Sequence, residues 1–165
     1  MSTSAPKSHP LRCVARVTIQ FITPFHVGTG EGGFGADALV VTDANDLPAI
    51  PGSSLAGALR AAFEKRYGES ATQSIFGFQN GDEGCGSRLA LSWACIHDQN
   101  GRPVEGLLAR SCSESDEVLK NALTLRSRDH VRLSHRGAAD TAGRAKFDEQ
   151  HVCAGHRFTF ELELV

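Results

Sequence analysis

The sequence predicts an α+β domain whose elements follow the order strand, helix, strand, insertion and strand. Residues 13–22 and 158–164 alternate apolar and polar side chains, as half-buried strands do. Residues 54–67 instead repeat apolar side chains at helical spacing. This order matches the first part of a ferredoxin-like or RRM-like fold, βαββαβ, and the last helix and strand of that fold have no counterpart in the pattern.

The first strand is expected to bury one of its two faces. The side chains on that face are Cys13, Ala15, Val17, Ile19 and Phe21. A Thr-Pro pair at residues 23–24 ends the strand, and a glycine-rich loop covers residues 28–35. Residues 38–42 are expected to be a short extended piece, and residues 43–48 a turn.

The helix over residues 54–67 follows a Pro-Gly turn and two serines. Its apolar stripe consists of Leu55, Ala58, Leu59, Ala62, Phe63 and Tyr67. Ser53 or Ser54 is expected to cap the helix, and Gly68 fits the position just beyond its end. The free N–H groups and the helix dipole suit an anion such as a phosphate, although Pro-Gly-Ser before a helix is also ordinary turn chemistry.

The second half of the chain predicts less regular structure. A Gly/Asn/Asp-rich loop is expected at residues 80–86, a strand at 88–97 and a turn at Asn100-Gly101. A short helix is expected over residues 115–123. Residues 131–146 hold few large apolar side chains and predict a mobile hairpin or loop. Residues 1–10 are polar with two prolines and predict a flexible tail before a single domain over residues 11–165.

Composition excludes a uniformly basic nucleic-acid binder, because the formal net charge is −2. The 41% apolar and 22% charged residues are typical of a soluble globular domain. Charge is nevertheless uneven, since residues 126–146 contain six basic side chains and only two acidic ones. The basic ones are Arg126, Arg128, Arg132, Arg136, Arg144 and Lys146. This stretch suits one anionic surface, and a solvated loop is the equal alternative.

Five scattered cysteines predict a reduced, cytoplasmic protein. No signal peptide and no bilayer-spanning apolar run is present in the sequence, and no membrane association is expected. Cys85, Cys95, His97 and Cys112 could gather a zinc ion, but their spacing fits no common zinc pattern. Zinc is therefore not expected, and the cysteines are predicted to be buried free thiols.

Several ordered segments together resemble the RAMP superfamily. Pro-Phe-His-Val-Gly-Thr-Gly at residues 24–30 is similar to the family's loop after its first strand, and residues 35–41 to its glycine-x-aspartate segment. Ile-Pro-Gly-Ser-Ser-Leu at residues 50–55 resembles the start of its helix. Later landmarks are Ile75-Phe76-Gly77, Ser87-Arg88-Leu89, residues 145–149 and residues 154–158. The likeness is to the backbone subunits of type III CRISPR RNA-guided effector complexes.

This resemblance implies a subunit that binds guide RNA, contacts target RNA and assembles with other RAMP-type subunits. One such subunit would complete the fold. Asp37 matches the aspartate of active backbone subunits, which implies target cleavage with Mg²⁺ or Mn²⁺. The residues implied to contact RNA are His26, Gly28, Gly30, Gly52, Ser53, Ser54, Arg60, Arg132, Arg144 and Lys146.

Other interpretations stay open at this point. Asp37 could cap a turn after Gly35, and His26 could serve as a general acid or base in RNA cleavage without a metal. Ala56 stands where the family usually has lysine, which removes one phosphate contact. The glycine-rich loop lacks Gly-Lys-Ser/Thr, so it is not a P-loop. The chain could also be a non-catalytic RNA-binding scaffold or a ferredoxin-like protein-assembly adaptor.

Overall fold

A computed structural model describes residues 11–32, 36–133 and 146–165. The tail expected at residues 1–10, most of the glycine-rich loop's second half, and Arg136 and Arg144 lie outside these ranges. The helices are α1 (Gly52–Tyr67), α2 (Glu69–Phe76), α3 (Arg110–Ser115) and α4 (Glu117–Leu123). The strands are β1 (Cys13–Gln20), β2 (Phe78–Asn80), β3 (Glu83–Cys85), β4 (Leu89–Leu91), β5 (Cys95–Ile96), β6 (Arg126–Val131), β7 (Lys146–His151) and β8 (Arg157–Leu164).

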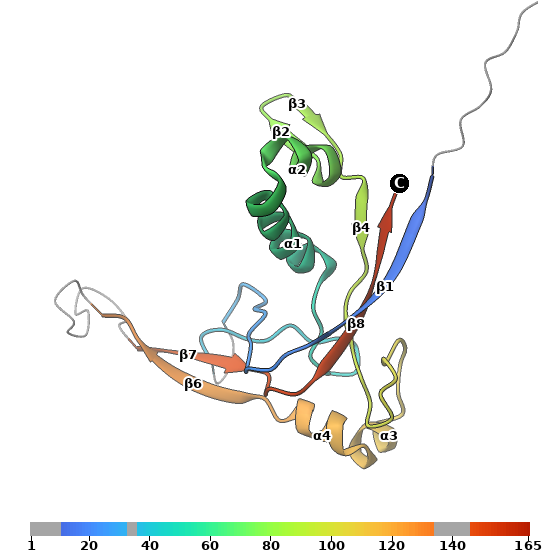
Figure 1. Cartoon of the computed structure of the whole chain (residues 1–165). Helices are drawn as coiled ribbons and strands as arrows, with labels where there is room; N and C mark the ends of the chain where they lie inside the picture. The colour runs from blue at the N-terminus through green and yellow to red at the C-terminus, as the bar shows by residue number, and fades with distance from the viewer. Residues whose placement is uncertain (1–10, 33–35, 134–145) are drawn as a thin grey trace, which may run out of the picture.

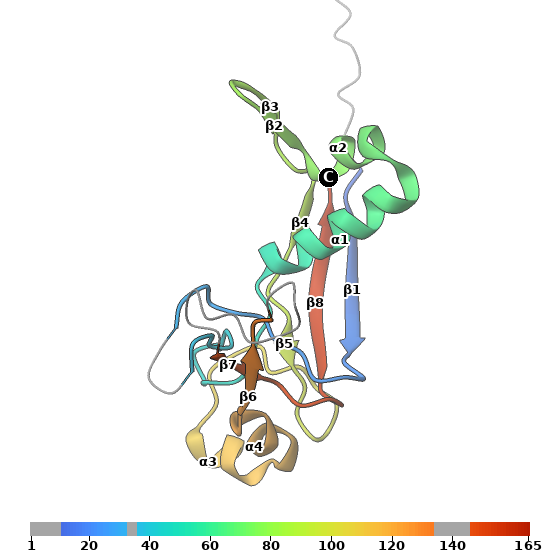
Figure 2. The same cartoon turned by 90° about the vertical axis from the view of Figure 1, so that its left-hand side faces the viewer.

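The main sheet has β8 at its centre. β1 pairs with one edge of β8 and β4 with the other, both antiparallel (Figure 1). β5 continues the β4 side of β8 (Figure 2). β1 and β4 therefore run parallel to each other and are joined through α1, which crosses in front of the sheet in Figure 2. This is the arrangement of the first three strands and first helix of a ferredoxin-like domain, so the predicted α+β class is confirmed.

The strand register places apolar side chains on one face. Ala15, Leu162 and Leu91 form one cross-strand row, and Cys13, Leu164 and Leu89 form the next. Deeper in the fold, Phe158 is fully buried and meets the stacked rings of Phe21 and Phe25 edge-on, with centroids 5.8 and 5.5 Å away. The core thus lies near the Arg157 end of β8, where loops cover the sheet.

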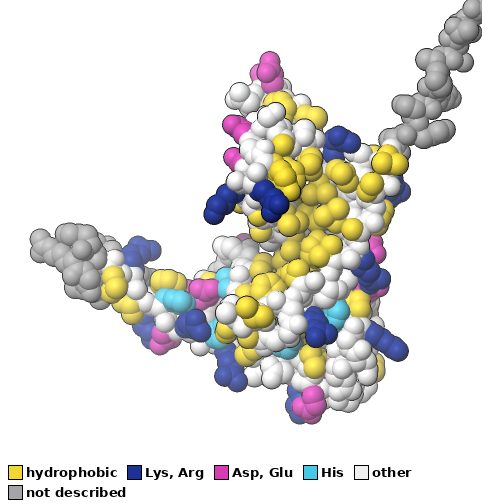
Figure 3. Space-filling model, viewed as in Figure 1, with side chains coloured by type: hydrophobic (Ala, Val, Ile, Leu, Met, Phe, Trp, Pro, Cys, Tyr) yellow, Lys and Arg dark blue, Asp and Glu magenta, His cyan; other side chains and the backbone are white. Residues whose placement is uncertain are grey.

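The half of the same face near Leu164 is only partly covered by the described residues. Cys13 and Ala15 are exposed, and on α1 the side chains of Leu59 and Tyr67 are 36% and 56% exposed. Figure 3 shows a continuous hydrophobic patch between the two helices and the strands. β1 also pairs with no strand on its outer side within the described part of the chain. The predicted apolar stripe of α1 is therefore only partly used inside this chain.

The predicted helix begins two residues earlier than expected and has a different cap. Pro51 is the N-cap and no side chain caps the helix, so the expected cap by Ser53 or Ser54 is wrong. Gly52 is buried where α1 starts, and an added Cβ would collide with the carbonyl oxygen of Leu91. At the other end Gly68, with φ of 84°, donates its N–H to Glu64, as the sequence predicted.

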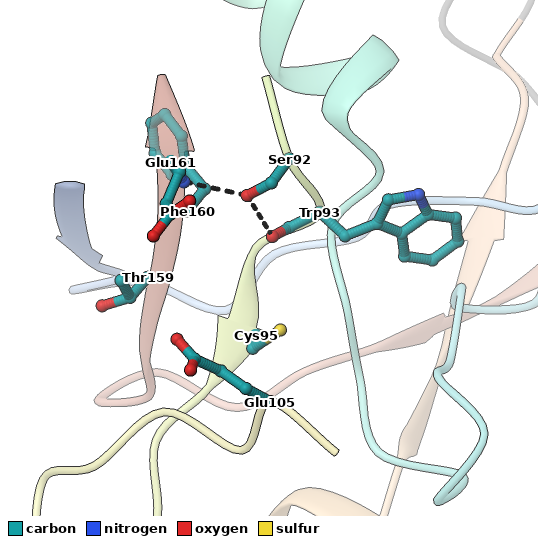
Figure 4. Close-up of a pocket in the computed structure, with 7 residues that line it drawn as sticks. All are labelled: Ser92, Trp93, Cys95, Glu105, Thr159, Phe160 and Glu161. Carbon is teal, nitrogen blue, oxygen red and sulfur yellow. Dashed lines mark hydrogen bonds between the residues drawn. The ribbon is translucent and has the colours of Figure 1, made fainter. Parts of the chain in front are cut away.

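The strand expected over residues 88–97 is broken in the structure. Between β4 and β5 the backbone of Ala94 exchanges hydrogen bonds with Ile50 instead of β8. The Ser92 hydroxyl accepts from the Glu161 N–H at 2.8 Å and donates to the Trp93 carbonyl (Figure 4). Trp93, which follows Ser92 in this break, is consequently 51% exposed.

Three further expectations need correction. The Gly/Asn/Asp-rich loop contains the β2–β3 hairpin, and the short helix expected at residues 115–123 is α4, which begins at Glu117 and is preceded by a further helix, α3. Asp116 separates them because its carboxylate accepts from the N–H groups of Val118 and Leu119. The cysteines are free but not buried: Cys13, Cys85 and Cys112 are exposed, and Cys95 and Cys153 are half-buried. No helix among the described residues is long and apolar enough to cross a bilayer.

Candidate nucleic-acid interface

Two loops that follow β1 lie against the β6–β7 hairpin. Phe25 pairs with Val152, and Ala38 pairs with Glu149, through backbone hydrogen bonds. Gly28 and Val40 pair with each other, which joins the two loops. The hairpin then projects away from the main sheet (Figure 1). This junction brings residues from three distant parts of the sequence onto one surface.

Asp37 is exposed at this junction and is fixed by β7. Its N–H donates to the Asp148 carbonyl at 3.0 Å, and the Asp148 N–H donates to Asp37 Oδ2 at 3.1 Å. The side chain therefore bonds a strand far along the chain, which is not the local turn-capping that was the alternative interpretation. One carboxylate oxygen, Oδ1, has no partner among the described residues. Asp37 is held in place with an acceptor available to a ligand.

Asp129, Lys146 and Asp148 form a charged group beside Asp37. Lys146 Nζ lies 3.1 Å from Asp129 Oδ2, and this hydrogen bond lowers the pKa of Asp129 and raises that of Lys146. The neighbouring Asp129 carboxyl raises the pKa of Asp148. Asp148 Oδ1 is buried with no donor in the described part of the chain, so a proton shared with Asp129 would satisfy it. The Lys146 charge, predicted to contact RNA, is thus already balanced.

His26 and the hairpin enclose the other side of the junction. His26 Nδ1 lies 2.6 Å from the Gln150 carbonyl, so this nitrogen carries a proton and donates. The ring also packs on Gly28, where an added Cβ would lie 2.5 Å from Nε2. Glu149 lies between His26 and His130, with its two oxygens 3.5 and 3.4 Å from their rings. A side chain at position 28 would therefore displace the His26 ring.

A family model of the RAMP superfamily matches residues 18–165. The chain belongs to the RAMP superfamily. No curated protein sequence matches the chain significantly.

Chains from solved CRISPR complexes share this fold at low sequence identity. One is a chain of type III-B Cmr-beta bound to cognate target RNA, with 16% identity and a TM-score of 0.59 over 93% of this chain and 46% of that chain. Another comes from the apo state of type III-B Cmr-beta, with 12% identity and a TM-score of 0.61 over 92% and 84%. A third comes from a type IV-B CRISPR complex, with 15% identity and a TM-score of 0.52 over 94% and 73%. The chain spans about half the length of the first of these.

The other residues that the RAMP resemblance implied to contact RNA do not all lie at this junction. Ser53 and Ser54 are exposed on α1, and Gly52 is explained by its packing on Leu91. Arg60 is half-buried and donates to the Gly77 carbonyl at 3.0 Å, which ties α1 to the end of α2. Arg132 is exposed on the hairpin side, and Gly30 adopts a φ of 84° in an open loop. The structure therefore separates the implied RNA-contacting residues of α1, which are Gly52, Ser53, Ser54 and Arg60, from those near the β6–β7 hairpin.

Several residues at the junction were not assigned to the site from the sequence. They are Arg128, His130, Asp148, Glu149 and His151. Arg128 and His130 were visible only as part of a basic stretch. Their partners lie on β7, and the register of β6 with β7 decides which side chains meet. Because the hairpin connection covers more than ten residues, turn length could not predict that register.

An acidic pocket elsewhere on the molecule is a poor RNA site. It has a volume of about 330 Å³ and is lined by Ser92, Trp93, Cys95, Glu105, Thr159, Phe160 and Glu161 (Figure 4). Glu105 pairs with Arg16, and no cation lies within 4 Å of the Glu161 carboxylate among the described residues. Figure 4 also shows the Trp93 indole directed away from both carboxylates. Net negative charge would repel a phosphate backbone there.

Among the described residues of this site, Asp37 offers a single ligand for a metal ion, and a bound nucleic acid would have to supply further ligands. No group of three or more His, Cys, Asp or Glu side chains within those ranges is arranged to hold a metal ion. A single carboxylate with one available oxygen suits Mg²⁺, which keeps several waters and takes further ligands from phosphate groups. The site is therefore compatible with a metal that arrives with RNA.

Proposed function

We propose that this RAMP protein is an RNA-binding backbone subunit of a CRISPR RNA-guided effector complex of the type III kind, and that Asp37 takes part in cleavage of the target RNA. The observation that carries the proposal is the placement of Asp37 next to a projecting hairpin that carries exposed arginines. Membership of the RAMP superfamily and the fold shared with chains of type III-B and type IV-B complexes support it.

The hairpin is the proposed RNA-contacting element. Arg126, Arg128 and Arg132 are exposed on it and form no ion pair with another described residue. Arginine binds phosphate oxygens with a planar, multidentate donor group, so these three side chains can follow an RNA backbone. Exposed arginines that form no ion pair among the described residues can displace counterions from the RNA, which makes binding salt-dependent.

Asp37 would hold Mg²⁺ or Mn²⁺ through its available oxygen. The metal, when bound, would supply charge stabilisation at the scissile phosphate. The backbone bonds to Asp148 keep the Asp37 carboxylate at one position, so the chain contributes orientation. RNA carries its own nucleophile, the neighbouring 2′-hydroxyl, and the protein therefore needs no nucleophilic side chain.

The decisive experiment uses the assembled complex with guide RNA and a labelled target RNA. Asp37→Ala should abolish Mg²⁺-dependent cleavage while guide binding persists. Asp37→Asn keeps the acceptor for the Asp148 N–H and removes the charge, so it should also be inactive although the junction stays intact. Normal cleavage by both variants would show that Asp37 is not catalytic.

A non-catalytic RNA-binding scaffold is the second candidate. It is favoured by the lack of a second free carboxylate beside Asp37 in the described ranges, because Asp129 is paired and Asp148 is partly buried. If the wild-type complex binds guide and target but never cleaves in Mg²⁺ or Mn²⁺, this candidate replaces the catalytic one.

Neighbouring subunits are proposed to cover the open apolar face. The patch between α1 and the sheet adjoins the outer edge of β1, which pairs with no described strand. This is where a ferredoxin-like domain has its second helix and fourth strand. A RAMP-type partner that supplies both elements would satisfy the free backbone groups and the exposed side chains together. A purely protein-assembling adaptor would use this face and leave the hairpin without RNA.

A further inference from the structure

A small pocket lies where the loop after β1 meets the base of the β6–β7 hairpin. Its volume is about 80 Å³, and it is lined by Pro24, Phe25, His26, Arg128, His130, Glu149 and His151. The three histidines and the arginine come from the loop and from both strands of the hairpin. The pocket is therefore assembled only when the hairpin is docked.

The pocket contains more potential donors than acceptors. Glu149 is the single carboxylate among its lining residues, and it is shared between the rings of His26 and His130. Arg128 stands opposite Glu149 in the strand register but forms no ion pair with any described residue. His151 Nδ1 is buried without a hydrogen-bond partner in the described ranges. The guanidinium and one or more imidazole N–H groups are thus left for an acceptor from outside.

The rings are positioned before any ligand binds. The Gln150 carbonyl fixes His26 through Nδ1, and the ring of His130 stacks on Phe147 with centroids 5.1 Å apart. Glu149 attracts both rings most strongly in their protonated forms. When both rings are protonated, Glu149 balances one charge, and the second charge adds to that of Arg128.

We propose that this pocket holds a backbone phosphate of bound RNA between the Arg128 guanidinium and the imidazoles of His26 and His130. The inference rests on the proposed RNA-binding function and assigns it a specific contact point. A pocket of this size suits one phosphate group and excludes a base. The RNA phosphate takes the place of the missing acceptor, and its charge favours the uptake of protons by the two rings.

Proton uptake makes RNA affinity depend on pH. Histidine changes its charge between about pH 5 and 8, and the charged groups facing these two rings are Glu149, Arg128 and His151. A phosphate held between the two rings favours their charged forms, so RNA binding should be tighter at the lower pH. We expect RNA to bind roughly five- to tenfold more tightly at pH 6 than at pH 8.

The test measures binding of a fluorescein-labelled single-stranded RNA by the full chain, using fluorescence anisotropy at pH 6, 7 and 8 and fixed ionic strength. Arg128→Gln should weaken binding at every pH, and His130→Gln should remove most of the pH dependence. Arg132→Gln is the matched control on the same hairpin, because it should weaken binding equally at all three pH values. Lys65→Gln, an exposed change on α1, should have little effect.

A second measurement needs no variant. Inorganic phosphate added to the wild-type chain should shift the ring proton signals of His26 and His130 in NMR spectra, and more strongly at pH 6 than at pH 8. Circular dichroism at each pH checks that every protein is folded.

The outcomes separate this inference from the proposed function. Binding of RNA with no pH dependence, and an Arg128→Gln variant that behaves like Lys65→Gln, would overturn the pocket assignment while RNA binding stands. Shifts with phosphate but an unchanged RNA affinity in Arg128→Gln would also overturn it as an RNA contact. Failure of the wild-type chain and of its complex to bind RNA at any pH would overturn both.

Discussion

Two glycines of α1 should respond in opposite directions to the same substitution. Gly52 is buried at the start of the helix, where an added Cβ would collide with the Leu91 carbonyl and lie 3.1 Å from the Ser92 carbonyl oxygen. Gly57 is exposed in the middle of the helix, and no atom lies within 4 Å of a Cβ added there. Gly52→Ala and Gly57→Ala therefore form a matched pair.

The expected sizes follow from these surroundings. Gly57→Ala should raise the free energy of unfolding by about 0.5–1 kcal/mol, because alanine loses less backbone entropy in a helix. Gly52→Ala should lower it by about 1–3 kcal/mol, since the colliding atoms belong to the backbone of β4 and cannot rotate away. For a chain of this length, each kcal/mol corresponds to about 2–4 °C in the melting temperature.

Thermal and urea unfolding followed by circular dichroism would measure both changes. Equal stability of Gly52→Ala and the wild type would refute the close packing of α1 on β4. A parallel RNA-binding measurement distinguishes the two explanations of Gly52: a packing role predicts that the folded variant keeps its RNA affinity, whereas a phosphate contact through this backbone predicts a loss.

Three further predictions concern pH, RNA and assembly. Burial lowers the pKa of His97 and of His156, so the unfolded chain takes up protons that the folded chain resists. The free energy of unfolding should be greatest above the unfolded histidine pKa of about 6.5 and fall as the pH drops below it, and His97→Gln should flatten this dependence in urea titrations at pH 5 to 8. Arg132→Gln should reduce the slope of log affinity against log salt concentration by about 0.7. Lys146→Gln should change this slope less, because Asp129 already pairs with the Lys146 ammonium group. Equal slopes for both variants would contradict this pairing. The chain expressed alone should be oligomeric because of its open apolar face, and a monomeric species in light scattering without a partner would argue against a covering subunit.

Local sequence patterns were enough to locate the main elements. Alternation located β1 and β8, and the helical repeat located α1, because these segments carry a period that depends only on which side chains face the core. The Gly68 terminus was also visible, since glycine relieves the strain of a positive φ wherever it occurs. The ordered landmark segments were sufficient to indicate the RAMP superfamily, which the family match confirms.

Long-range pairing decided what the local patterns could not. The break between β4 and β5 exists because Ala94 pairs with Ile50, a partner more than forty residues away. The cap at Ser53 or Ser54 was wrong because the packing of Gly52 on Leu91 sets where α1 begins.

The same distinction applies to the candidate site. The sequence by itself singled out Asp37, His26 and a basic stretch as separate features. Only the tertiary structure joined them, because β7 supplies the backbone groups that hold Asp37 and His26 and the carboxylate of Glu149. It also showed that the Lys146 charge is paired and that Arg128 forms no ion pair with a described residue. Side-chain type is a property of the sequence, whereas the register of two strands joined by a long connection determines which charges meet and which remain for RNA.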